Sequence, residues 1–110
     1  INVVSKLVNK DSVNEQDSKG LTPLMYASLN NYPEIVQLLL DNGAKINMVD
    51  NMAKSTALIW ASTADSVKAA RVLLSNKLVD KNIKDTHGHD ALYYARSEEM
   101  KSLLTTGPRI

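Results

Sequence analysis

The clearest apolar pattern in the chain lies between Pro33 and Gly43. Apolar residues from Ile35 to Leu40 fall three and four positions apart, which places them along one side of a helix. Pro33 suits the first position of a helix, and Gly43 suits the position just after its end. The pattern therefore predicts an amphipathic helix that starts at Pro33 and stops before Gly43.

A shorter helix is predicted just before this one. Thr22 can cap its amino end with the side-chain hydroxyl, and Pro23 follows at the first helical position, where a missing N–H is no loss. The helix is expected to run to about Leu29, and Asn30 and Asn31 then suit a turn. Beyond the second helix the chain is polar and extended, which predicts an exposed loop or hairpin.

The same pattern returns twice more along the chain. Three kinds of residue recur at a spacing of 34 residues, and such self-similarity is typical of a repeat protein. Recurring Asn and Asp residues precede each set and mark the joints between units. The recurring residues are Leu24, Leu58 and Leu92; Tyr26, Trp60 and Tyr94; Ala27, Ala61 and Ala95; Asn14, Asn47 and Asn82; and Asp17, Asp50 and Asp85.

These residues resemble the ankyrin repeat. The stretch from Asp17 to Asn47, with its Gly-Leu-Thr-Pro-Leu start at Gly20, matches that repeat from end to end, except that Met25 replaces the usual histidine. Tetratricopeptide repeats have a similar period but lack this Gly-Ala, Asn and Asp punctuation. The resemblance implies an all-α ankyrin-repeat solenoid, in which helix-turn-helix units stack and hairpin loops project.

The units differ in regularity. We expect a single domain over 1–110, made of a partial first repeat (1–16), two full repeats (17–49 and 50–84) and a capping repeat (85–107). The second full repeat is 35 residues long against 33 for the first, with one extra residue in the loop before its first helix and another in the loop after its second. In the last repeat the second helix arrives early and is more polar, as a terminal unit requires.

Composition and charge restrict the function classes. The 110 residues carry a formal charge of +1 and contain 44 % hydrophobic and 23 % charged residues, which are ordinary values for a folded domain. We expect no nucleic-acid partner because there is no broad positive field, and no membrane partner because apolar runs are short. The absence of cysteine favours an intracellular, cytoplasmic location. We expect the domain to be a monomer.

Few residues suggest chemistry. His87 and His89, beside two aspartates, form a weak metal-site candidate, but no third ligand is fixed by spacing, so a solvated loop is the preferred interpretation. Glu98 and Glu99 are neighbours on a helix and point in different directions. No nucleophile elbow, phosphate loop or zinc motif occurs. We therefore expect no enzyme activity, no catalytic or metal-binding residues and no cofactor.

The resemblance implies a protein-interaction scaffold that binds a protein partner. Partners of such repeats contact the hairpin tips and the exposed, concave side of the first helices, and Leu21, Leu29 and Met52 are apolar there, which makes them the expected anchors. Tyr26, Trp60 and Tyr94, called the aromatic column below, are expected to stack the first helices on one another. The basic residues near Lys68 and Arg71 are expected to form a solvated convex face. The residues expected to contact the partner are Ser18, Lys19, Leu21, Leu29, Asn30, Asn51, Met52, Lys54, Thr63, Ala64, Thr86, His87, His89 and Ser97.

Two other functions fit the sequence. The repeats can be a regulatory or targeting segment of a larger enzyme, because such arrays are often attached to catalytic domains. They can also be a structural spacer without a dedicated partner. A flat and wholly polar concave face would favour the spacer.

Overall fold

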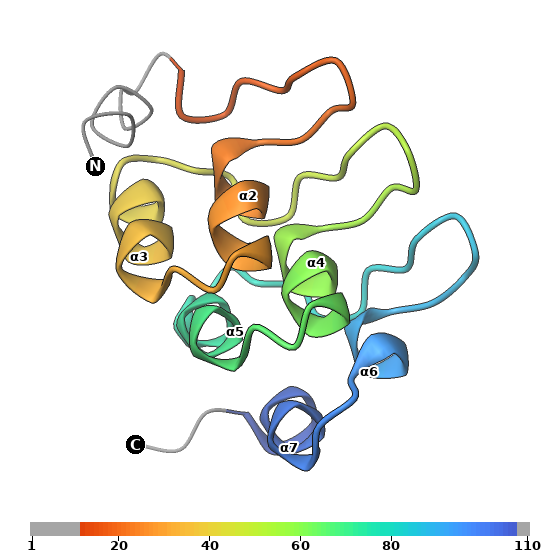
Figure 1. The fold of residues 1–110 in the computed structure, drawn as a ribbon. Helices are drawn as coiled ribbons and strands as arrows, with labels where there is room; N and C mark the ends of the chain where they lie inside the picture. The colour runs from red at the N-terminus through yellow and green to blue at the C-terminus, as the bar shows by residue number, and fades with distance from the viewer. Residues whose placement is uncertain (1–11, 108–110) are drawn as a thin grey trace.

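The structure, a computed structural model, describes residues 12–107 (Figure 1). Residues 1–11, which belong to the predicted partial repeat, lie outside this range. The described residues form six helices in three pairs, and no strand occurs among them. The helices are α2 (Pro23–Leu29), α3 (Pro33–Asp41), α4 (Ala57–Thr63), α5 (Val67–Ser75), α6 (Ala91–Tyr94) and α7 (Glu98–Thr106).

Each first helix of a pair begins at a side-chain cap, which the sequence predicts at Thr22. The Thr22 hydroxyl accepts the backbone N–H of Met25 at 3.2 Å, and Thr56 makes the same bond at 3.2 Å. Asp90 takes this role in the third unit and accepts the N–H of Tyr93 at 3.0 Å. These bonds satisfy backbone donors that would otherwise lack a partner in the first turn.

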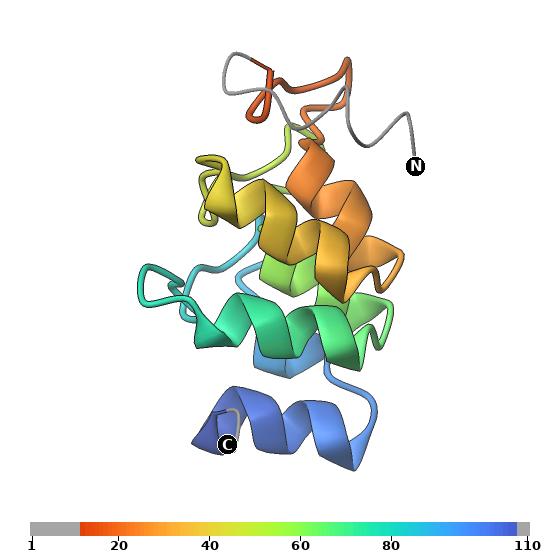
Figure 2. The ribbon, with the colours of Figure 1, turned by 90° about the vertical axis from the view of Figure 1, so that its left-hand side faces the viewer.

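The helices form two columns, with the hairpins on one side. The first helices α2, α4 and α6 follow one another beside the three hairpin loops (Figure 1), and the second helices α3, α5 and α7 lie one above another on the other side (Figure 2). The body measures 35 × 33 × 21 Å, so the chain is a short slab rather than the elongated body typical of longer arrays.

The core lies between the columns and between successive units. Leu39 and Leu73, which are 34 residues apart on the second helices, are both fully buried, as the helix phase predicts. Leu24 and Leu58 are buried at the equivalent positions of the first helices. Leu92 repeats their spacing but is exposed, because α6 is the last first helix of the described part and no later one covers it.

The recurring asparagines join neighbouring units through their loops. Asn14 donates to the carbonyl of Gly43 at 3.1 Å and accepts the N–H of Lys45 at 2.7 Å. Asn47 makes the same pair of bonds to the loop of the following unit, at 2.8 and 2.9 Å. A side-chain amide can replace both partners of a backbone pair, which explains why this residue type recurs at the joint.

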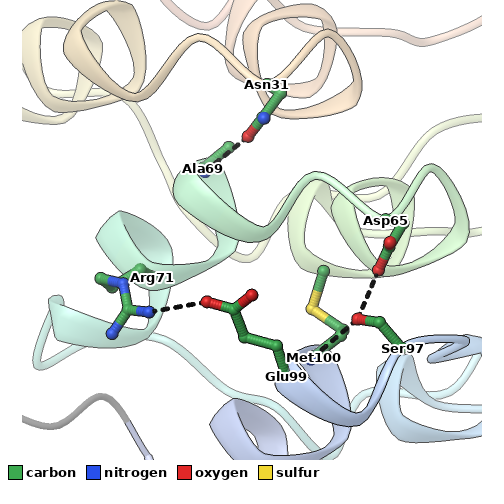
Figure 3. A network of polar contacts seen from close by, with 7 residues as sticks. All are labelled: Asn31, Asp65, Ala69, Arg71, Ser97, Glu99 and Met100. Atoms are coloured by element: carbon green, nitrogen blue, oxygen red, sulfur yellow. Dashed lines mark hydrogen bonds and ion pairs between the residues drawn. The ribbon is translucent and has the colours of Figure 1, made fainter.

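Polar contacts also join the turn between the two helices of one unit to the second helix of the next unit (Figure 3). Asn31 accepts the backbone N–H of Ala69 at 3.0 Å, and Asp65 accepts the hydroxyl of Ser97 at 2.8 Å. Ser97 itself caps α7 by accepting the N–H of Met100 at 3.1 Å. Ser97 was expected among the partner contacts, but its hydroxyl already donates to Asp65 and accepts the N–H of Met100.

The basic residues near α5 lie on the side away from the hairpins, as expected. Lys68 is exposed, and Arg71 forms an ion pair with Glu99 at 3.3 Å (Figure 3). Both partners of this pair are largely exposed, so the pair adds little to stability.

Candidate protein-binding surface

Each hairpin is closed by the aspartate at its start. In the first hairpin one carboxylate oxygen of Asp17 accepts the N–H groups of Lys19 and Leu21, both at 2.9 Å. The other oxygen accepts the hydroxyl of Tyr26 on α2. The carboxylate therefore fixes the tip of the loop and ties it to the first helix of the same unit.

The other two hairpins repeat this arrangement. Asp50 accepts the indole N–H of Trp60 at 2.8 Å, and Asp85 accepts the hydroxyl of Tyr94. Each recurring aspartate thus binds the aromatic residue of its own unit and holds the hairpin against the first helix. Although Trp60 and Tyr94 pack partly against the core, the polar atoms of this column anchor hairpins, which differs from the expected stacking between first helices.

The bonds in the first and third hairpins shift the pKa values of the carboxyl and phenol groups that form them. The bond from Tyr26, followed by the bond from the Leu21 N–H, lowers the pKa of Asp17, and the same contact raises the pKa of Tyr26. Burial works against ionisation of Asp85, but the bond from Tyr94 and two backbone N–H groups outweigh it and lower its pKa. The carboxylate raises the pKa of Tyr94 to about 12. The links of the first and third hairpins are therefore intact around neutral pH, with Asp17 and Asp85 ionised and the phenols of Tyr26 and Tyr94 neutral.

Backbone hydrogen bonds connect each tip to the next. The N–H of Asn51 donates to the carbonyl of Lys19 at 3.0 Å, and the N–H of Thr86 donates to the carbonyl of Ala53 at 2.8 Å. Gly20 lies against Asn51 so closely that an added Cβ would be 2.5 Å from its backbone nitrogen. The three tips therefore form one continuous edge beside α2, α4 and α6 (Figure 1).

The second hairpin carries the extra residue that the sequence predicts, and this residue changes which position takes the left-handed conformation. Lys54 has a φ of 59° and occupies the place that Gly20 and Gly88 fill in the other tips. Counted from the aspartate at the start of the hairpin, the equivalent residue is Ala53. The insertion shifts the turn by one position, so that the side chain of Lys54 projects from the tip and is exposed.

Most of the expected tip residues are exposed side by side along this edge. Met52 is 50 % exposed, the largest apolar contribution among them, and Lys19 and His87 are exposed at the neighbouring tips. The row thus combines one apolar side chain with cationic, polar and aromatic neighbours. The expected contact residues that are exposed at the tips are Ser18, Lys19, Asn51, Met52, Lys54, Thr86 and His87.

Leu21 corrects the sequence prediction. It was expected to face solvent as an anchor, but it is only 9 % exposed and belongs to the core. The hairpin turns back at Gly20, and the bond from the Leu21 N–H to Asp17 fixes the backbone so that the side chain packs inward. Leu21 therefore contributes to folding rather than to an open surface.

The expected contacts at the helix ends are less open than those at the tips. Leu29 and Ala64 are half-buried, and the carbonyl of Leu29 accepts a hydroxyl from the next unit. Asn30 and Thr63 are exposed, but their side chains each donate to a backbone carbonyl of their own helix. These residues border the exposed tip residues rather than extend them.

The third tip carries an aromatic cluster. The ring of His89 is half-buried and stacks on Tyr93 with centroids 3.6 Å apart and an interplanar angle of 5°. His87 lies 6.3 Å from His89, centroid to centroid. Within residues 12–107 no three His, Cys, Asp or Glu side chains gather with the geometry of a metal site.

Two aromatic residues of the first helices are exposed although the sequence pattern did not predict it. Tyr26 is 43 % exposed and Tyr93 is 63 % exposed, and both lie on first helices close to the hairpins. Tyr93 occupies the position of Met25 and Ile59, which are buried. No pattern in the sequence separates it from them, because its exposure depends on whether a further helix lies beside it.

None of the described helices combines the length and the apolar character needed to cross a bilayer.

Comparisons with known proteins agree with this architecture. A family model described as ankyrin repeats in many copies matches residues 7–61. Ankyrin repeat protein FPV031 of fowlpox virus (strain NVSL) is 38 % identical over 94 % of this chain and 33 % of its own length. The palmitoyltransferase Hip14 of Drosophila melanogaster is 32 % identical over 74 % of this chain and 13 % of its own.

Among solved structures, the ankyrin repeat domain of Bcl-3 superposes with a TM-score of 0.80 and 30 % identity, over 91 % of this chain and 44 % of that one. The chain spans a third or less of the length of the curated relatives it matches. The matched family model and the shared helix-pair architecture give the same assignment. The chain belongs to the ankyrin-repeat family.

Proposed function

We propose that this chain is a protein-interaction module that binds a partner through its tip row, defined here as Ser18–Lys19, Asn51–Lys54 and Thr86–His89. Ankyrin repeats generally mediate protein–protein interaction. The observation that carries the proposal is the pair of backbone hydrogen bonds, at 3.0 and 2.8 Å, that link the three tips into one edge.

A linked edge is a good binding surface for a physical reason. Loops that must become ordered on binding reduce affinity, whereas loops held in place before binding do not carry this cost. In this chain the aspartates fix each tip internally and the backbone bonds fix the tips to one another. The exposed side chains of Met52 and its neighbours are therefore presented in a defined order.

The second-helix side offers less to a partner. Gln37 donates to Asp41 at 2.8 Å, and Arg71 pairs with Glu99, so several of its polar groups are already engaged with each other. Such a solvated helix face is ordinary protein surface. It provides the control for the experiment.

The test compares two triple variants in affinity capture. The first variant changes Lys19→Ala, Met52→Ser and His87→Ala, one exposed residue from each tip, and leaves every backbone link in place. We expect it to lose captured protein, because a few residues dominate most interfaces and truncating one of them typically costs about 2 kcal/mol or more. Circular dichroism and the urea midpoint should stay close to those of the unchanged chain, since exposed substitutions usually alter stability by about 0.5 kcal/mol or less.

The control variant changes Gln37, Lys68 and Arg71 to alanine on the second-helix side. It should retain the captured protein. If the control loses the partner and the tip variant keeps it, the binding surface is on the opposite side of the stack. If both variants keep it, the tip row has no part in capture.

A related function is that the module serves a larger protein as an attached segment. The palmitoyltransferase Hip14, of which the matched region is 13 %, is a relative of this kind. In that setting the repeats proposed here, at residues 17–49, 50–84 and 85–107, form an attached segment. This segment positions a partner beside another domain of the same protein. The same tip variant, placed in the full polypeptide, should release the partner while the activity of the other domain is unchanged.

A further inference from the structure

The loop that follows α5 presents a leucine to solvent. Leu78 is 76 % exposed, more than any other large apolar side chain of the described residues. Its carbonyl accepts the amide of Asn47 at 2.8 Å, and in the preceding loop the carbonyl of Gly43 accepts the amide of Asn14 in the same way, at 3.1 Å. A leucine therefore stands where the first unit has a glycine, in the loop that carries the extra residue.

Hydrogen bonds hold Leu78 in this exposed position. Its N–H donates to the side-chain oxygen of Asn76 at 2.9 Å, while its carbonyl is bound by Asn47. Asn76 follows α5 with a ψ of 132°, whereas Asn42 follows α3 with a ψ of 19°, so the chain leaves α5 in a more extended form. Because both backbone groups of Leu78 are bonded, the loop needs little further ordering to present this side chain to a partner.

Leu78 forms one wall of an apolar groove with the end of α3 and the loop after it. The groove has a volume of about 600 Å³. Figure 2 shows the loops that follow α3 and α5 projecting one above the other beyond the ends of these helices. A hollow of this kind can take up a large apolar side chain. The other apolar side chains in its lining are Leu40, Ala44, Ile46 and Met48.

Lysines outnumber carboxylates around the groove. Lys45 belongs to the lining, and Lys77 precedes Leu78; both are exposed. Lys81 and Lys84 follow in the same loop. The ion pairs among residues 12–107 include neither Lys45 nor Lys77.

The carboxylates of the same two segments already have donors. Asp41, at the end of α3, accepts the side-chain amide of Gln37 at 2.8 Å. Asp80 accepts the N–H of Asn82 at 2.9 Å. The segments 40–48 and 76–84 contain no other acidic residue, so the rim of the groove carries an excess of positive charge.

We propose that this groove is a second binding surface, separate from the tip row, for an extended acidic segment of a partner protein that carries a large apolar side chain. The apolar side chain lies against Leu78 and Met48. The Asp or Glu residues that flank it lie beside Lys45 and Lys77, where opposite charges favour association.

Two other negatively charged partners fit the groove less well. Single-stranded nucleic acid binds by stacking its bases on aromatic side chains, and the lining of this groove has none. A bilayer takes up protruding apolar side chains and leaves a hollow unfilled. The hollow beside Leu78 therefore favours a peptide.

The test titrates the chain with a short synthetic peptide, a leucine between glutamates, and follows backbone amide shifts by NMR. We expect saturable shifts at Ala44, Lys45 and Leu78, and weaker binding as salt is raised, because salt screens exposed charges. A peptide with lysines in place of the glutamates should bind at least about tenfold more weakly. A peptide with serine in place of the leucine should also bind about tenfold more weakly, because it buries no large apolar side chain.

Matched variants separate the groove from the rest of the surface. Leu78→Ser should weaken binding of the acidic peptide about tenfold or more. Leu38→Ser, at an exposed leucine of α3 outside the groove lining, should leave the affinity unchanged. These residues are exposed, so both variants should keep the urea midpoint.

Charge reversal provides the second comparison. Lys45→Glu combined with Lys77→Glu should weaken binding of the acidic peptide about tenfold or more, because like charges then face each other. Lys68→Glu combined with Lys101→Glu makes the same change in net charge away from the groove and should alter the affinity little.

The results that overturn the proposal are distinct. Equal binding of the glutamate and lysine peptides, or unchanged affinity in Leu78→Ser, shows that the groove does not select an acidic apolar segment. Shifts centred on Met52 assign the peptide to the tip row instead. Binding of DNA or of vesicles of anionic lipid, without binding of the peptide, assigns the surface to one of those partners. The triple tip variant should bind the peptide unchanged, so a failure of the tip row and a failure of the groove are separate results.

Discussion

The substitution Gly20→Ala tests whether neighbouring hairpin tips stabilise one another. Gly20 has a φ of 82° and lies against the next tip, where an added Cβ would be 2.5 Å from the Asn51 nitrogen and 2.6 Å from its Cγ. Gly88 takes the same place in the last tip, with a φ of 80°, and has no atom within 4 Å of an added Cβ. The two glycines differ mainly in whether a further tip lies beside them.

The structure sets the size of the expected effect. An L-residue in the left-handed conformation costs about 1 to 2 kcal/mol, and this cost applies to both substitutions. At Gly20 the second tip must also move, which weakens the hydrogen bond from Asn51 to Lys19, worth about 1 kcal/mol net. We therefore expect Gly20→Ala to lower the free energy of unfolding by about 2 to 3 kcal/mol and Gly88→Ala by about 1 to 2 kcal/mol.

Urea unfolding followed by circular dichroism measures this difference. With a slope of about 2 kcal/mol per M for a small domain, a difference of about 1 kcal/mol separates the two midpoints by about 0.5 M. Hydrogen exchange of the Asn51 N–H should accelerate in Gly20→Ala and not in Gly88→Ala. Equal midpoints and unchanged exchange would refute the idea that the tips support one another.

Two further predictions follow from the core and from the hairpin links. Leu39→Ala or Leu73→Ala should lower the free energy of unfolding by about 2 to 5 kcal/mol, whereas Gln37→Ala, which removes an exposed side chain, should shift the urea midpoint little; comparable midpoints would contradict the helix phase. Because the pKa of Tyr94 is raised to about 12 in the fold, the stabilising effect of its neutral phenol is complete below about pH 10 and is lost as pH rises through 12. In an alkaline titration followed by tyrosinate absorbance, Asp85→Asn should therefore remove the component near 12 and move it to lower pH.

The helices could be predicted because their signals are local. The Thr22 cap and Pro23 mark the start of α2 within the sequence itself, and the apolar stripe around Leu39 defines the buried side of α3. A period of 34 residues then extends these predictions to the other units. Each signal depends on residues within one or two helical turns, so no tertiary information is needed to read it.

The candidate surface was harder to predict because exposure is a property of neighbours. Leu21 stands at a loop position, yet the closure of its hairpin by Asp17 turns its side chain into the core. Tyr93 stands at a buried position of the repeat, yet it is exposed because no later unit of the described part covers it. In both cases the residue type and its spacing are the same whether the side chain is covered or open.

The aspartate-to-aromatic links join this surface to the stack and so connect stability with binding. Tyr26 is part of α2, and its hydroxyl holds the carboxylate that in turn holds the backbone of Lys19 at the tip. A change that displaces α2 from its packing against α4 moves Tyr26, and the tip loses its support even though no tip residue has changed. For this reason, a core variant that loses partner binding does not show that the substituted residue contacts the partner. Only variants that keep the urea midpoint of the unchanged chain can identify the residues that contact it.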